Sequence, residues 1–215
     1  MQFKTQCLIV DYFFSLYHNI IMKYDVILAG VGGQGVLSVA SIIARAAMSE
    51  GLEVRQSEVH GMAQRGGAVL AHLRTSDKKI PGDLVPKGGA DLIISMEPLE
   101  SLRYISYLKP EGVLVTASDP YNNITDYPET ESIYSAIKSL PVWRIINASL
   151  IAKEAGLALA VNTVMVGAAS CFLPVKDISI EKTLALSFAS KNETVVLANI
   201  KAFKLGQAAC RRGAA

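Results

Sequence analysis

The stretch Tyr24–Leu37 constrains the fold more than any other part of the sequence. It predicts a buried strand, Asp25–Ala29, that ends in a glycine-rich turn at 30–35. A helix is predicted after the turn, because apolar residues recur there on one face at positions 36, 39, 40, 43 and 47. A strand, a tight turn and a helix in this order open an α/β domain.

The glycine turn also predicts a binding site for a negatively charged or polar group. Glycine adopts positive φ and allows another group to approach the backbone closely. The helix that follows presents unpaired N–H groups at its positive end. The candidate contact residues are Gly30, Gly32, Gly33, Gln34 and Gly35.

The spacing Gly30-x-Gly32-x-x-Gly35 fits the dinucleotide-binding fingerprint only in part. That fingerprint requires an acidic residue near the end of the second strand to bind a ribose. Glu53 lies too early on the predicted second strand, and Glu58 lies past it. From these residues alone, a tight turn that needs no ligand is the favoured interpretation, ahead of a nicotinamide or flavin site.

The remainder of the chain alternates strand-like and helix-like segments and shows no internal repeat. We predict strands at 52–55, 68–74, 91–96, 113–116 and 142–146, a helix at 97–108 that Pro110–Gly112 stops, and a surface loop at 118–131. The C-terminal third predicts helices within 150–172, at 180–189 and after a capping box at 190–193. The expected fold is one doubly wound, Rossmann-like α/β domain, with a mostly parallel sheet and a helical C-terminal cover.

Composition excludes several classes of function. The 215 residues are 51% hydrophobic, enough for one sizeable core. Lysine and arginine exceed the acids only by 21 to 19, so no nucleic-acid or membrane partner is indicated. The cysteines Cys7, Cys171 and Cys210 are too far apart for a disulfide framework or a cluster-binding run, which favours a reducing cytoplasm.

Residues 1–21 do not fit the rest of the chain. The segment is too short and too interrupted by polar residues to span a membrane, and it lacks the organisation of a signal peptide. We predict that Met22 is the natural start, that 1–21 is a mis-assigned extension, and that 22–215 is the domain. Mass spectrometry of the native N-terminus tests this prediction, and a peptide from 1–21 would refute it.

A second segment, Ser57–Gly67, carries polar side chains and glycines with little to bury, and it predicts a binding loop. Arg65 could hold a carboxylate or phosphate, while Glu58 and His60 could orient each other. A structural histidine and an Arg65–Glu58 pair are the alternatives. No nucleophile with an adjacent base and no histidine pair with metal-ligand spacing is present. The candidate contact residues here are Ser57, Glu58, His60, Gly61, Gln64, Arg65, Gly66 and Gly67.

The two segments together resemble the gamma-type domain of the 2-oxoacid:ferredoxin oxidoreductases, and more narrowly the beta (small) subunits of the indolepyruvate branch. The resemblance rests on Gly-Val-Gly-Gly-Gln-Gly-Val-Leu37 followed by Glu58-Val-His-Gly-Met-Ala-Gln-Arg-Gly-Gly67. It continues through 90–104 and 162–167, and covers about Met22 to Gly206. The motif His-Gly-Met-Ala-Gln at 60–64 favours the arylpyruvate branch over the pyruvate and 2-oxoglutarate branches.

The resemblance implies an oxidative decarboxylation of an arylpyruvate to aryl-acetyl-CoA, CO2 and reduced ferredoxin. It implies that thiamine diphosphate, magnesium and 4Fe-4S clusters belong to a large alpha subunit, and that coenzyme A is a co-substrate. This chain would then carry no cofactor, no metal and no catalytic residue, and would reach ferredoxin through the complex. The absence of grouped cysteines agrees with this expectation.

Three alternatives stay open from the sequence. The first is the gamma subunit of a pyruvate or 2-oxoglutarate:ferredoxin oxidoreductase. The second is a free-standing dinucleotide-binding oxidoreductase, which explains the glycine turn but lacks the ribose acid. The third is a non-catalytic interaction module, which leaves the polar segment 57–67 without a purpose. The sequence does not select the 2-oxoacid or the stoichiometry of the complex.

Overall fold

The structure is a computed structural model that describes residues 23–60, 66–122 and 124–212. The predicted extension 1–21 and the predicted start at Met22 lie outside these residues, so both stay predictions. Among the described residues, no helix combines the length and the apolar character that crossing a bilayer requires.

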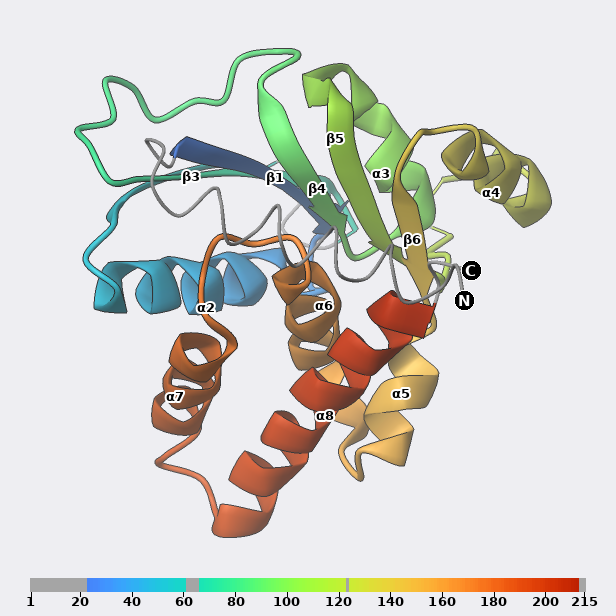
Figure 1. The fold of residues 1–215 in the computed structure, drawn as a ribbon. Helices are drawn as coiled ribbons and strands as arrows, with labels where there is room; N and C mark the ends of the chain where they lie inside the picture. Colours follow the sequence, from blue (N-terminus) through green and yellow to red (C-terminus); the bar gives the residue numbers. More distant parts are fainter. Residues whose placement is uncertain (1–22, 61–65, 123, 213–215) are drawn as a thin grey trace, which may run out of the picture.

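A six-stranded sheet with the order β2-β3-β1-β4-β5-β6 forms the centre of the molecule (Figure 1). β1, β4, β5 and β6 pair in parallel, whereas β3 is antiparallel to both β1 and β2, so within this sheet β3 alone runs in the opposite direction. The predicted mostly parallel α/β sheet is therefore confirmed, with an antiparallel hairpin on one side. The strands are β1 (Lys23–Val31), β2 (Glu53–His60), β3 (Ala68–Ser76), β4 (Ala90–Ser95), β5 (Leu108–Ala117) and β6 (Trp143–Ile146).

Helices cover both faces of the sheet (Figure 1). One core contains Val26, Leu28 and the apolar sides of α2, α6 and α8. The other contains Ile27, Ile93 and the apolar side of α4. Alternate β1 residues thus face opposite cores, as expected for a strand that is covered on both sides. The helices are α2 (Val36–Ser49), α3 (Pro98–Arg103), α4 (Thr130–Lys138), α5 (Ala148–Glu154), α6 (Val161–Ser170), α7 (Asp177–Ser187) and α8 (Glu193–Arg212), with 3-10 turns η2 (Ile105–Tyr107) and η3 (Ala158–Ala160).

Several predicted boundaries and one predicted cap were wrong. The helix predicted to run to Leu108 ends at Arg103, and Pro110 lies within β5, where the pairing with β4 shifts register. A register shift tolerates proline, because some residues there make no ladder hydrogen bond. The sequence pattern also did not predict α4. The last helix is capped by Asn192, whose Oδ1 accepts the Val195 N–H at 2.9 Å, rather than by the predicted box at 190–193.

A buried ion pair joins β1 to β3 near the amino end of β1. The Arg74 guanidinium donates to both Asp25 oxygens, at 2.9 and 3.3 Å, and both side chains are almost fully buried. Arg74 also donates to the carbonyl oxygens of Gly82 and Leu84 at 2.8 and 3.0 Å. One side chain therefore fixes the strand pairing and the loop between β3 and β4.

Two glycines allow α6 and α8 to pack closely. A Cβ added at Gly167 would lie 2.1 Å from the carbonyl oxygen of Phe203, and one at Gly206 would lie 2.1 Å from that of Val164. These obstacles are backbone atoms, so any larger residue must push the helices apart.

We expect Gly167→Ala to lower the free energy of unfolding by about 1–3 kcal/mol, the usual cost of overpacking a core. Urea denaturation measures it. Gly82→Ala is the matched control, because its Cβ would meet no heavy atom within 4 Å and its φ is not in the left-handed region. Equal stabilities for the two variants would contradict the tight crossing.

Candidate functional site

The predicted glycine turn lies beside the end of the predicted polar segment. β1 extends to Val31, so Gly30 belongs to the strand and the turn itself starts at Gly32. The Gly32 N–H donates to the Gly67 carbonyl oxygen at 2.8 Å, and the Gly66 N–H donates to the Gly32 carbonyl oxygen at 3.4 Å. The β1–β3 pairing therefore continues into the turn and brings two separate sequence segments together.

The turn is stabilised from within. Gly33 and Gly35 have φ of 101° and 76°, in the left-handed region where a side chain is strained. Gln34 folds back, and its Oε1 accepts the Val31 N–H at 2.8 Å. The Gln34 side chain thus supports the turn rather than projecting freely from it.

Asn162, at the start of α6, packs against the turn from the other side. Its Nδ2 lies 3.4 Å from the Gly35 carbonyl oxygen, and it would lie 2.1 Å from a Cβ placed on Gly35. The segment 162–167 belonged to the family resemblance without an assigned role. The structure places its first residue at the glycine turn.

Backbone donors remain available at this turn. Among the described residues, the N–H groups of Gly33, Gly35, Val36 and Leu37 have no hydrogen-bond acceptor. They lie at the N-terminus of α2, where the helix dipole favours negative charge. The turn therefore presents N–H donors from which an anionic or polar group could accept hydrogen bonds, as the sequence predicts.

The first part of the predicted binding loop Ser57–Gly67 is a strand rather than a loop, and the contact role predicted for its residues stays a prediction. Ser57, Glu58 and His60 lie in β2 and pair with β3 residues 72, 71 and 69. An edge strand leaves many side chains in water, and so a polar sequence is compatible with it. Gly61, Gln64 and Arg65 lie outside the described residues, and their proposed roles stay predictions.

The position of β2 also bears on the dinucleotide interpretation. Glu58 lies near the end of β2, not past it, and so it occupies the expected place along the strand for a ribose acid. In the dinucleotide-binding fold this strand lies next to the first one. Here β3 lies between β1 and β2, which moves Glu58 one strand away from the turn.

Sequence reasoning missed a buried carboxylate at the end of β4. Glu97 is 1% exposed and accepts hydrogen bonds from the Glu100 N–H at 2.7 Å, the Tyr121 N–H at 3.3 Å and the Tyr127 hydroxyl. Burial and the Glu97 carboxylate both raise the pKa of Tyr127, which keeps that hydroxyl protonated as a donor. Glu97 directly precedes Pro98 at the start of a helix, a capping pattern that could have revealed it.

The hydrogen bonds of Glu97 also hold the segment that follows β5 close to the end of β4. Tyr121 and Tyr127 attach this segment to Glu97, and Tyr134 donates to the Ser118 carbonyl oxygen at 2.5 Å. One oxygen of Asp119 is buried without a hydrogen-bond partner among the described residues. The turn, Glu97 and this segment all follow the carboxyl ends of parallel strands, the edge where α/β folds bind ligands.

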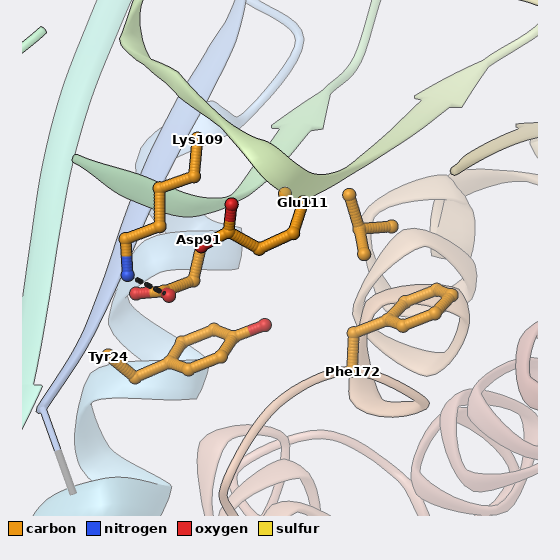
Figure 2. Close-up of a pocket in the computed structure, with 7 residues that line it drawn as sticks. Tyr24, Asp91, Lys109, Glu111 and Phe172 are labelled. Atoms are coloured by element: carbon orange, nitrogen blue, oxygen red, sulfur yellow. Dashed lines mark hydrogen bonds and ion pairs between the residues drawn. The ribbon is translucent and has the colours of Figure 1, made fainter. Parts of the chain in front are cut away.

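A cavity of about 240 Å³ lies at the opposite, amino-terminal ends of the parallel strands (Figure 2). Tyr24, Asp91 and Lys109 lie on one side of it and Phe172 on the other. Asp91 accepts the Asp25 N–H at 2.8 Å and pairs with Lys109. Burial, and then the Asp91 carboxylate, raise the pKa of Tyr24. The charged side chains Asp91 and Lys109 in this cavity thus pair with each other. The cavity lies at the amino ends of β1, β4 and β5, away from the glycine turn.

The described residues contain no group of three or more histidine, cysteine or acidic side chains that could hold a metal ion. Cys171 and Cys210 are free thiols. The candidate site is thus a surface of backbone donors and supporting side chains.

Residues 25–209 match the family described as pyruvate ferredoxin/flavodoxin oxidoreductase. The chain belongs to this family. It is 39% identical over 194 residues to the indolepyruvate oxidoreductase subunit IorB of Archaeoglobus fulgidus, over 86% of this chain and 94% of that protein. It is 36% identical to the corresponding subunit of Pyrococcus horikoshii, over 88% of this chain and 96% of that protein. The predicted family and its indolepyruvate branch are confirmed.

Solved structures agree with the fold. The gamma subunit of a keto/oxoacid ferredoxin oxidoreductase from Geobacter sulfurreducens has a TM-score of 0.64 and 25% identity, and the match covers 88% of this chain and 99% of that one. A 2-oxoglutarate:ferredoxin oxidoreductase from Magnetococcus marinus has a TM-score of 0.70 and 23% identity, over 88% of this chain and 31% of that one. The predicted fold class is therefore that of the oxidoreductase gamma subunits.

The two left-handed glycines of the turn should respond differently to alanine. Gly33→Ala meets no atom within 4 Å and should cost only the backbone strain, roughly 1–2 kcal/mol. Gly35→Ala adds a clash with Asn162 and should lower the free energy of unfolding further. Urea denaturation of both variants measures the difference, and a smaller loss for Gly35→Ala would contradict the described contact.

Proposed function

We propose that this chain is the small subunit of an indolepyruvate:ferredoxin oxidoreductase. The complex oxidatively decarboxylates an arylpyruvate to aryl-acetyl-CoA and CO2, and it reduces ferredoxin. The observation that carries the proposal is the similarity to indolepyruvate oxidoreductase subunits at 34–39% identity, over 94–96% of their length. The pyruvate, 2-oxoglutarate and ketoisovalerate relatives are 26–30% identical.

Thiamine diphosphate, magnesium and the 4Fe-4S clusters belong, in this proposal, to a large alpha subunit. The number of cysteines in this chain supports the assignment of the clusters to the partner. A 4Fe-4S cluster is held by four cysteine thiolates, and the whole chain has three cysteines. The side chains present therefore do not fit a cluster, and no electron-transfer step is assigned to them. Electrons reach ferredoxin through the partner.

The role of this chain is to supply part of the coenzyme A pocket at the carboxyl edge of the sheet. The N–H groups of Gly33, Gly35, Val36 and Leu37, which have no acceptor among the described residues, suit a diphosphate or another anionic group. Arg65 directly precedes Gly66, whose N–H bonds to the turn, and a guanidinium can bind a phosphate through two parallel hydrogen bonds. The Magnetococcus marinus relative was solved with coenzyme A and succinyl-CoA bound.

We expect Arg65→Ala to raise the KM for coenzyme A roughly ten- to hundred-fold, the usual worth of a charged hydrogen bond. The assay is indolepyruvate-dependent reduction of ferredoxin by the enzyme co-expressed with its large subunit. The KM for indolepyruvate should stay unchanged.

Arg45→Ala is the matched control, because Arg45 is exposed on α2 beyond the turn. Its kinetics should equal those of the parent enzyme. An unchanged KM for coenzyme A in Arg65→Ala would refute the pocket assignment but not the subunit assignment. Failure to co-purify with a brown, cysteine-rich subunit, together with tight NAD binding by this chain alone, would refute the subunit assignment.

A further inference from the structure

Two of the three cysteines meet where α6 ends against α8. Cys171 follows the last residue of α6, and Cys210 lies in the last turns of α8. The Cys171 Sγ lies 3.8 Å from the carbonyl oxygen of Gln207, which precedes Cys210 by one helical turn. Residues three apart lie on the same face of a helix, so Cys210 faces the end of α6 as Gln207 does, and Cys171 packs against the core cluster that contains Cys210.

The surroundings hold the two thiols in place and add positive charge. The Arg144 Nε donates to the Cys210 carbonyl oxygen at 3.0 Å, and its guanidinium lies 5.6 Å from the centre of the Phe172 ring. Arg211 approaches Cys171 from α8. The tight crossing at Gly167 and Gly206 fixes α6 and α8 against each other.

The two thiols differ in access to solvent. Cys171 is half-buried, whereas Cys210 is 1% exposed. A reagent in solution therefore meets Cys171 first, and the thiol within its reach is Cys210. A reversible disulfide forms in two steps, in which an accessible thiolate makes a mixed disulfide and a second nearby thiol resolves it.

We propose that Cys171 and Cys210 are a thiol–disulfide modification site that low-molecular-weight disulfides oxidise. The Cys171 thiolate attacks one sulfur of the reagent and releases one reagent thiolate, leaving a mixed disulfide on Cys171. The Cys210 thiol then loses its proton and attacks the Cys171 sulfur, which releases the second reagent thiolate. The two protein thiols become one disulfide, and the reagent disulfide becomes two thiols.

Electrostatics assigns the order of attack. The hydrogen bond from Cys210, and the Arg211 charge, lower the pKa of Cys171 to about 7, although burial and Asp177 oppose them. The same hydrogen bond and burial raise the pKa of Cys210, against the Arg144 charge. Cys171 is therefore the thiolate that attacks, and its reaction accelerates as the pH rises through about 7.

The bond would join α8 to the end of α6 that lies opposite the glycine turn. Asn162 contacts Gly35 at the start of α6, and Cys171 follows its last residue. Oxidation would thus lock the helical cover at a point remote from the predicted coenzyme A contact. The proposal does not depend on the proposed function.

The test uses the full chain carrying Cys7→Ser, treated with oxidised glutathione and analysed by mass spectrometry and peptide mapping. The expected product is lighter than the reduced protein by two hydrogen atoms, contains the linked peptides of Cys171 and Cys210, and returns to the reduced mass with dithiothreitol. Two independent glutathione adducts, one stable adduct on Cys171, or no reaction in the folded protein would each overturn the proposal.

Two variants separate the roles of the thiols. Cys210→Ala should stop at a single glutathione adduct on Cys171, whereas Cys171→Ser should not react while folded. Circular dichroism checks that each variant is folded. Because the main result comes from the protein with both cysteines, it stands even if Cys210→Ala proves unstable. Faster reaction of Cys210 in the Cys171→Ser protein would overturn the assigned order.

Discussion

The antiparallel pairing of β1 with β3 is the interaction on which the rest of the structure depends. It runs from Lys23 opposite Ser76 to Val31 opposite Ala68, and it continues through the hydrogen bonds between Gly32 and the segment 66–67. The buried Asp25–Arg74 ion pair fixes its other end. Any other register of β1 on β3 would separate Asp25 from Arg74 and leave a charge unpaired in the interior. The ion pair therefore disfavours every alternative register. The candidate site is a consequence of this register.

Much of the fold was predictable from local patterns. β1, the glycine turn, α2 and the C-terminal helices follow from apolar spacing and from glycine, which act within a few residues. The direction of β3 was not predicted, although the sequence contains a usable signal. Parallel strands need a connection of about a dozen or more residues, and only residues 61–67 separate β2 from β3. A connection that short favours a hairpin.

The site was harder to predict because its parts come from distant segments. The glycine turn was recognised, but Asn162 meets Gly35 across 127 residues, and no local pattern indicates that contact. The sequence pattern places Glu97 at the start of a predicted helix, but the contacts that bury it come from Tyr121 and Tyr127 in the segment after β5. The two cysteines are far apart in the sequence, and only the crossing of α6 and α8 brings them together.

The place of β2 at the border of the sheet has a consequence for a subunit that must meet a partner. Its outer backbone groups lack a neighbouring strand within the described sheet. Such a border can recruit strands from other molecules. Glu53, Arg55 and Glu58 put both signs of charge along it, and a foreign strand would have to strip water from these groups before it could add to the sheet. The charges on β2 therefore disfavour aggregation of the free subunit through this edge strand before it assembles with a partner subunit.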